Sequence, residues 1–377
     1  MKVLSKHVQL LAFACNFIAL YLPDLSLQFP LPMKMFKYLS YILFAFGCVG
    51  RGFSSKKFGY AIAALAFSAG TAVFTRDIYY SSLVLIAFSM SDIDYHEVFK
   101  LSFYLLSGLM ITTLLLAFAG ILPMVVTSNN IISGRMGMGY YHSNVLPLVI
   151  FYLLVFRIFW KDGELKRIEM IMWSCIAGAV YVACRSRNGF LPTLMLTSAF
   201  FVKTFPKAEE KIEKVFNFKI CRLFMDNSIL LLSAFSLTMS LIAGKGLRWV
   251  YLVNRFFTGR FALAYLKMQI IGLHFINLMG NEEFNIGYTL DNGYIYTILR
   301  FGILFILIYI VIQRRIVKKC EYNVFCIFAF AVVSLSNFID NDLLSYGFLP
   351  LIVMAASDHW QFSFREISKK YFEGVKV

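Results

Sequence analysis

The chain has 377 residues, of which 59% are hydrophobic, 17% are aromatic and only 15% are charged. A soluble globule cannot bury so much apolar surface, so this composition predicts a polytopic membrane protein and excludes an ordinary water-soluble enzyme. The formal net charge of +15 does not require a nucleic-acid partner, because the anionic cytoplasmic leaflet attracts basic loops beside membrane helices.

Twelve apolar runs are long enough, or nearly long enough, to cross about 30 Å of hydrocarbon as helices. They cover residues 7–23, 36–50, 58–74, 77–91, 99–122, 144–160, 168–184, 188–205, 226–244, 292–312, 322–339 and 342–357. The first run lacks a small-residue cleavage site, so we interpret it as a retained helix. The expected fold is all-α, with one transmembrane domain over residues 1–377 and one long extracytoplasmic loop over residues 245–291.

Most lysines and arginines follow the positive-inside rule when the amino terminus is placed in the cytoplasm. The predicted inner loops contain Arg51, Lys56, Lys57, Lys161, Lys166, Arg167, Lys203, Lys207, Lys211, Lys214, Lys219, Arg222, Arg314, Arg315, Lys318 and Lys319. A second set falls in loops on the opposite side: Arg135, Arg185, Arg187, Arg255 and Arg260. The topology rule does not explain these five arginines, so they predict a bound anion.

Two of these arginines lie in a tight turn between predicted spans, in the sequence Cys-Arg-Ser-Arg-Asn-Gly at 184–189. Guanidinium groups bind phosphate oxygens in a bidentate manner and keep their charge at any working pH. We therefore predict that Arg185, Arg187 and Asn188 bind substrate. The alternative is that both arginines extend to lipid headgroups, as long basic side chains at helix ends commonly do.

A glycine-rich stretch at 133–144 ends just before the next span and contains Arg135 and His142. Glycines permit a close approach of the backbone to a ligand, while the two side chains supply a cation and a titratable nitrogen. The alternative is a flexible loop in which Ser143 or Asn144 caps the following helix.

The long loop at 245–291 has polar motifs near both of its ends. Thr258 is expected to cap a helix that opens at Gly259, so that Arg260 and the positive helix end face one anion. Residues 259–279 are interrupted by charged residues, which favours an interfacial or re-entrant helix over a thirteenth span. The alternative to anion binding is an interfacial amphipathic helix whose Arg260 and Lys267 bind lipid, with His274 as a polar residue at the interface. The loop closes on Asp291, Asn292 and Tyr294, of which Asn292 and Tyr294 are predicted to bind substrate.

Two further polar stretches do not lead to a clear assignment. Asp340 and Asp342 lie in a predicted outer turn, where a plain polar turn is the simplest interpretation, although a pair with an arginine or with sugar hydroxyls is the alternative. The seven cysteines include no CxxC pair, so neither a disulfide framework nor a zinc site is expected.

Taken together and in this order, the stretches at 135–144, 186–189, 258–260 and 291–294 resemble the Wzy-type polysaccharide polymerases, of the O-antigen ligase and polymerase superfamily. The resemblance covers roughly residues 130–300. It does not extend to the first hundred residues or to the acidic stretch at 92–97.

The resemblance implies a GT-C-like membrane glycosyltransferase in the bacterial cytoplasmic membrane, with its active site facing the periplasm or the cell exterior. Such enzymes join glycan repeat units of O-antigen, capsule or exopolysaccharide. Donor and acceptor are both linked to undecaprenyl pyrophosphate, and a chain-length regulator and a flippase are possible partners besides the membrane lipids. No cofactor or metal is expected, because arginines neutralise the departing pyrophosphate. The base that takes the acceptor proton is left open between His142, His274 and Asp291.

Two rival functions differ in their expectations. An O-antigen ligase keeps the chemistry but transfers the finished glycan to another acceptor. A flippase or transporter for lipid-linked glycans requires ionisable residues deep inside spans and broken helices near the midplane, whereas the charges here gather at one surface.

Overall fold

The apolar runs of the sequence form helices in a computed structural model that describes residues 2–27, 29–49, 85–128, 131–245, 247–257, 259–277, 290–340 and 345–357, with single positions at 62, 66, 69, 70 and 284. In chain order the elements are α1 (Lys2–Tyr21), η1 (Leu22–Asp24), α2 (Pro30–Val49), α5 (Tyr95–Phe118), β1 (Val125–Ser128), β2 (Ile131–Met136), α6 (Val145–Trp160), α7 (Arg167–Cys184), α8 (Arg187–Lys203), α9 (Pro206–Phe216), α10 (Lys219–Asp226), α11 (Ser228–Ala243), α12 (Arg248–Phe256), α13 (Arg260–Ile271), α15 (Gly293–Phe301), α16 (Ile303–Lys319), α17 (Val324–Ile339) and α18 (Leu349–Ala356).

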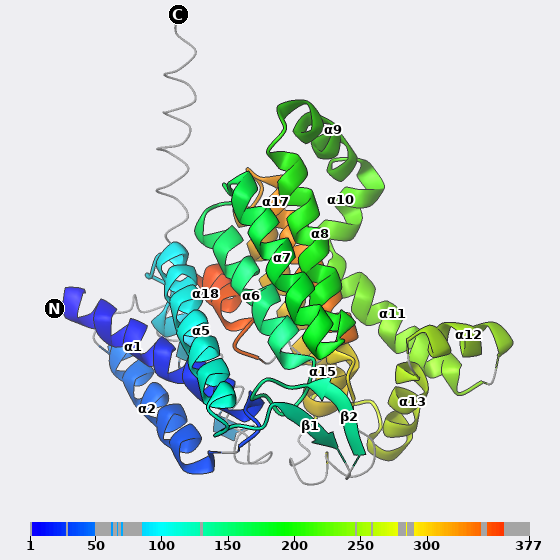
Figure 1. Ribbon diagram of the computed structural model, residues 1–377, viewed down its shortest axis with the longest axis horizontal. Coiled ribbons are helices and arrows are strands. Elements are labelled where there is room, and N and C mark those ends of the chain that lie inside the picture. Colours follow the sequence, from blue (N-terminus) through cyan, green and yellow to red (C-terminus); the bar gives the residue numbers. More distant parts are fainter. Residues whose placement is uncertain are drawn as a thin grey trace, which may run out of the picture.

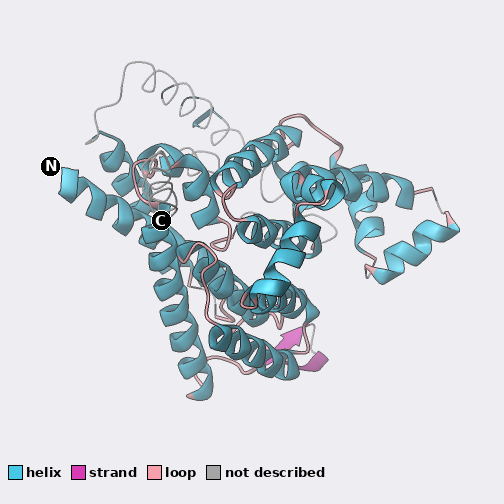
Figure 2. Ribbon diagram, turned by 90° about the horizontal axis from the view of Figure 1, so that it is seen from above, coloured by secondary structure: helices cyan, strands magenta, loops and turns pink. Residues whose placement is uncertain are grey.

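Ten of the twelve predicted spans overlap a helix with described bounds, and the other two, 58–74 and 77–91, lie mostly outside the described residues. The helical fold class is confirmed, with the addition of an antiparallel β1–β2 hairpin that the sequence analysis did not predict. Figure 2 shows the helices packed side by side and the hairpin at their edge.

Within the described residues, α5 and α7 are long and apolar enough to cross a membrane. The pair α10 and α11, which is bent by 80°, provides a third span if the two helices are counted as one. Helices such as α6, with 16 residues, are about 24 Å long and fall short of a full hydrocarbon crossing. The structure therefore supports a few membrane-spanning helices.

The core of the bundle is built around α6 and α17. Fourteen of the sixteen residues of α6 and thirteen of the sixteen of α17 are buried, so these helices are covered on all sides by others. In contrast, α7 buries four of its eighteen residues. It exposes Ile168, Met172 and Val182, which is unfavourable in water and fits a helix that faces lipid.

Helices α5, α6, α7 and α8 run alternately up and down, so their connections gather at two opposite ends of the bundle (Figure 1). The hairpin and the α7–α8 turn lie at one end, where the sequence placed the second set of arginines. The α6–α7 turn, α9 and α10 lie at the other end, together with the inner-loop lysines and arginines that they contain, while Arg51, Lys56 and Lys57 lie outside the described residues. The segment 245–291 contains α12 and α13, and α12 projects away from the bundle in both views.

The predicted span at 292–312 is instead two helices, α15 and α16, that meet at Gly302. Gly302 has a φ of +96°, and a Cβ atom there would lie 2.5 Å from the carbonyl oxygen of Phe275. The break thus follows from a backbone conformation and a close contact that only glycine allows.

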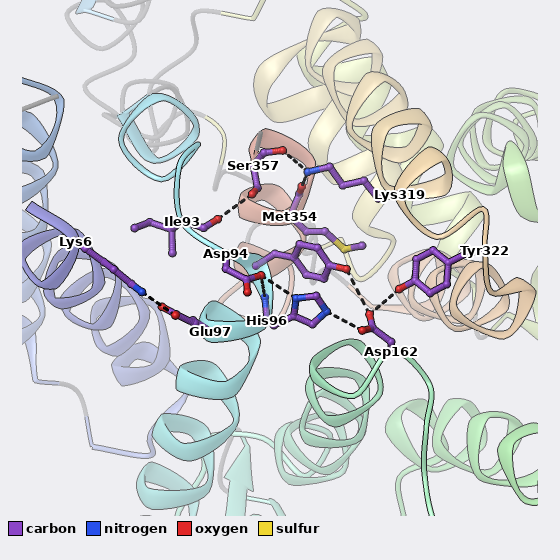
Figure 3. A network of polar contacts seen from close by, with 11 residues as sticks. Lys6, Ile93, Asp94, His96, Glu97, Asp162, Lys319, Tyr322, Met354 and Ser357 are labelled. Carbon is purple, nitrogen blue, oxygen red and sulfur yellow. Dashed lines mark hydrogen bonds and ion pairs between the residues drawn. The ribbon is translucent and has the colours of Figure 1, made fainter. Parts of the chain in front are cut away.

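The acidic stretch at 92–97 organises the end of the bundle that lies opposite the hairpin (Figure 3). The His96 ring lies between two carboxylates, with Nδ1 2.8 Å from Asp94 Oδ1 and Nε2 2.8 Å from Asp162 Oδ2. Tyr322 donates a hydrogen bond of 2.6 Å to Asp162 Oδ1. Asp162, in the α6–α7 turn, therefore connects the start of α5 to the turn before α17.

Replacing Asp162 by Asn is expected to lower the free energy of unfolding by about 1–2 kcal/mol, because a charge-assisted hydrogen bond to His96 is lost. Asp162 has a φ of +50°, a conformation that Asn also tolerates, so the backbone is not the cause. Thermal melting in detergent micelles measures the effect. Glu164→Gln is the control, because the Glu164 side chain is 79% exposed in its pair with Lys203 and such pairs contribute little. Equal melting of all three proteins contradicts the assignment.

Candidate anion-binding site

Four of the five arginines that the sequence assigned to the outer side line one pocket of about 810 Å³. Arg135 comes from β2, Arg185 and Arg187 from the α7–α8 turn, and Arg260 from the start of α13. The other lining residues are His142, Asn144, Tyr181, Val182, Ser186 and Asn188. No carboxylate lines the described part of this pocket. We call it the arginine pocket, and its charge favours an anionic ligand.

The α7–α8 turn reverses the chain within two residues because Arg185 adopts a left-handed conformation, with φ +51° and ψ +35°. Its backbone N–H donates to the Tyr181 carbonyl oxygen at 2.7 Å. A non-glycine residue in this region is strained by about 1 kcal/mol or more, which is common at functional sites. Among the described residues, no carboxylate pairs with Arg185 or Arg187.

The amino-terminal ends of α6 and α8 meet beside the arginine pocket. A Cβ atom on Gly189 would lie 2.2 Å from both the carbonyl carbon and the oxygen of Pro147, so the two backbones touch at this glycine. Neither helix has an acidic residue in its first turn or a side-chain cap. Two positive helix ends therefore add to the charge of the arginines.

Gly189→Ala is expected to push α8 away from α6 and to lower the free energy of unfolding by about 1–3 kcal/mol. Because Asn188 and Arg187 move with the helix start, the affinity for anions should fall as well. Thermal melting and pyrophosphate binding are the measurements. Gly178→Ala in α7 is the matched control, since no atom lies within 4 Å of its added Cβ. A melting temperature equal to that of the control contradicts the contact.

Arg135 and His142 are positioned by the β1–β2 hairpin and the loop that follows it. The backbone N–H of Ser26 and its Oγ both donate to the Gly139 carbonyl oxygen, at 3.0 and 2.9 Å. The N–H of Tyr141 donates to the Asp24 carbonyl oxygen at 3.1 Å. The stretch at 133–144, for which a flexible loop was the alternative prediction, is thus hydrogen-bonded to the segment after α1.

The hydrogen bonding of His142 fixes which ring nitrogen carries the proton. The backbone N–H of Asn144 donates to Nδ1 of His142 at 3.1 Å, so Nδ1 acts as an acceptor and has no proton. In the neutral ring the proton is then on Nε2. His142 can donate a hydrogen bond to a ligand from Nε2, but in this tautomer Nε2 cannot accept a proton.

Arg260 begins α13 and is the most buried part of this charge cluster, with 15% of its side chain exposed. Its Nη2 lies 3.4 Å from Oδ2 of Asp291, whose side chain is 60% exposed. The Arg260 Nε atom is buried and has no hydrogen-bond partner among the residues that the structure describes. Thr258, the predicted cap, lies outside the described residues. Asn254 performs this role, because its Oδ1 accepts from the N–H groups of Phe261 and Ala262 at 3.1 Å.

Five of the predicted site residues do not line the arginine pocket, and one of them, Asp291, contacts it only through Arg260. Arg255 is exposed in the last turn of α12. His274 follows the far end of α13, a helix roughly 18 Å long, and its Nε2 is 2.9 Å from the Ile271 carbonyl oxygen. Asn292 is buried and caps α15 by accepting from the N–H groups of the second and third residues after it. The buried Tyr294 hydroxyl donates to the Ser334 carbonyl oxygen at 2.8 Å.

Asn188 connects the arginine pocket to the last predicted outer turn. Its Nδ2 donates to Oδ2 of Asp340 at 2.9 Å, so the amide oxygen of Asn188 is left to accept from a ligand. Asp342 lies outside the described residues. Of the pocket residues, Asn144, Tyr181, Val182 and Ser186 were not predicted as site residues, and the only sequence signal for Ser186 is its place between two arginines.

No family model, curated protein or solved structure matches this chain.

Proposed function

We propose that the arginine pocket binds the diphosphate of a lipid-linked glycan and that the protein is a membrane glycosyltransferase which polymerises such glycans. The observation that supports this most strongly is the convergence of Arg135, Arg185, Arg187 and Arg260 on one pocket, which no carboxylate of the described residues lines. A diphosphate needs several cationic donors at once, and guanidinium groups supply two parallel N–H donors each. The pocket volume of about 810 Å³ is large enough for a diphosphate with its first sugar.

The surroundings of the pocket favour an anion that is attached to a lipid. Val182 lines the pocket and its side chain is 75% exposed. It belongs to α7, which is long and apolar enough to cross a membrane. A prenyl chain can therefore extend from the pocket along the exposed apolar face of α7, while the diphosphate remains among the arginines.

In the proposed reaction, an acceptor hydroxyl oxygen attacks the anomeric carbon of the donor sugar. The bond from that carbon to the diphosphate oxygen breaks, and the electron pair leaves with the lipid diphosphate. The arginines and the positive ends of α6 and α8 stabilise the charge that develops there. His142 donates to the same group through its Nε2 proton.

The acceptor proton moves to a base, and Asp291 is the candidate that the contacts favour. Its carboxylate lies beside Arg260 at the edge of the pocket, whereas His274 lies elsewhere and the tautomer of His142 is a donor. Asp291 thereby combines an exposed position, open to an acceptor sugar, with proximity to the anion site.

Purified protein that is given only one lipid-linked repeat unit tests the proposal. A polymerase produces longer lipid-linked chains and free lipid diphosphate, resolved by gel electrophoresis. A ligase makes no longer chain until a second kind of acceptor is added. Absence of any glycan transfer under both conditions, with the substrate bound, contradicts the proposed activity.

A further inference from the structure

The hydroxyl of Ser186 is buried in the wall of the arginine pocket without a partner. Ser186 is 3% exposed, it lines the pocket, and its Oγ makes no hydrogen bond within the described part of the chain. Buried polar groups in proteins are nearly always paired. A ligand atom in the pocket would complete this missing hydrogen bond.

Ser186 is also the cap residue of α8, a helix of 17 residues. It has the extended conformation of a helix cap, with φ −109° and ψ 128°, in which a serine oxygen usually accepts from the first turn of the helix. Here it makes no such bond. The first N–H groups of α8 have no partner within the helix. They belong to the residues that begin with Arg187 and Asn188, and these two residues line the pocket.

Covalent catalysis by Ser186 is not supported by these contacts. A nucleophilic serine needs a base within hydrogen-bond reach of Oγ, and none of the described residues meets this condition. Two flanking guanidiniums, an unused hydroxyl donor and the positive end of a helix instead form a set of donors for one tetrahedral anion.

We propose that Ser186 Oγ and the first amides of α8 bind one phosphoryl group of the diphosphate directly, while Arg185 and Arg187 neutralise its charge. This inference rests on the proposed function and assigns the position of the leaving group within the pocket. It makes Ser186 a ligand-binding residue rather than a structural cap.

Titration of the full-length protein with inorganic pyrophosphate, in micelles of a detergent without phosphate, tests the assignment by calorimetry. Ser186→Ala should weaken binding by roughly tenfold or more, because one hydrogen bond to a charged group is lost. Ser186→Thr keeps the hydroxyl and should stay within about threefold of the parent. Ser240→Ala is the control, since that buried hydroxyl donates to the Ser236 carbonyl oxygen within α11 and does not line the pocket.

The melting temperature of the unliganded protein separates binding from structure. Removal of an unpaired buried hydroxyl should leave the melting temperature of Ser186→Ala unchanged or higher. A lower melting temperature together with normal pyrophosphate affinity would make Ser186 a structural residue and overturn the inference.

Arg187→Ala distinguishes this inference from the proposed function. If Arg187→Ala loses pyrophosphate binding and Ser186→Ala does not, the phosphoryl site at Ser186 and the first amides of α8 is wrong, but the arginine pocket remains the anion-binding site. If both variants bind normally, the proposed function fails as well. If phosphatidylglycerol displaces pyrophosphate at comparable concentration, the phosphoryl site accepts any lipid phosphate, and its assignment to a diphosphate is wrong.

Discussion

Arg187→Lys and Arg260→Lys are each expected to slow chain extension by about 10²-fold, although the net charge of the protein does not change. Lysine keeps the positive charge but loses the planar pair of N–H donors that matches two phosphate oxygens. The two arginines come from separate segments of the chain and line the same pocket. Rates of extension of a lipid-linked repeat unit, measured at saturating substrate, give the effect.

Arg255→Lys is the matched control for both variants. Arg255 is exposed in the last turn of α12 and does not line the pocket, so its conservative replacement should leave the rate within twofold, roughly the scatter of a neutral surface change. If Arg187→Lys and Arg260→Lys extend glycans as fast as this control, the guanidinium groups do not hold the leaving group.

Asp291→Asn is expected to reduce the rate constant of transfer by about 10²- to 10⁴-fold, the range for loss of a general base. The amide has nearly the shape of the carboxylate but cannot accept the proton of the attacking hydroxyl. Binding of pyrophosphate should be retained or improved, because the carboxylate that lies 3.4 Å from Arg260 Nη2 is removed. Single-turnover kinetics and calorimetry separate the two effects.

His274→Ala serves as the comparison. His274 follows the far end of α13, so we expect this variant to transfer glycan at the normal rate. A different result would reassign the base. Full activity of Asp291→Asn, combined with an inactive His142→Ala that still binds pyrophosphate, would mean that His142 changes tautomer during the reaction and takes the proton.

Apolar runs and charge predict those features that depend on residues close together in the sequence. Long apolar runs predict both ends of α6, α7 and α17 to within two residues and both ends of α5 to within four, because each run is bounded by polar turns. Arg185 and Arg187 follow equally from the sequence, since two arginines in a two-residue reversal must lie close together. The positions of Arg135 and Arg260 depend on tertiary packing. Only the three-dimensional structure shows that they line the same pocket as Arg185 and Arg187.

The predicted site residues at the end of the long loop separate in the structure for one physical reason. Asp291, Asn292 and Tyr294 form one motif in the sequence, but α15 begins inside it. The amide of Asn292 is used to cap that helix, and the Tyr294 side chain points into the core, so only Asp291 remains near the pocket. Neighbouring residues at a helix start diverge in direction, which a linear motif does not reveal.

Burial and hydrogen bonding are the second kind of information that the sequence lacks. Ser186 reads as an ordinary helix cap, and its missing partner is visible only in three dimensions. The acidic stretch at 92–97 had no assigned role from motifs. In the structure its His96 joins two carboxylates from distant segments at the end of the bundle opposite the hairpin.

A cryo-electron microscopy structure of the protein in nanodiscs with a non-hydrolysable undecaprenyl diphosphate glycan tests the central claim most directly. If the arginine pocket binds the leaving group, both phosphates will lie within hydrogen-bond distance, about 3 Å, of guanidinium nitrogens from Arg185, Arg187 and Arg260. The prenyl chain will lie along α7. Density for the diphosphate at another place, such as the pocket at the opposite end that is lined by both basic and acidic side chains, among them Arg222, Arg314 and Glu321, would contradict it.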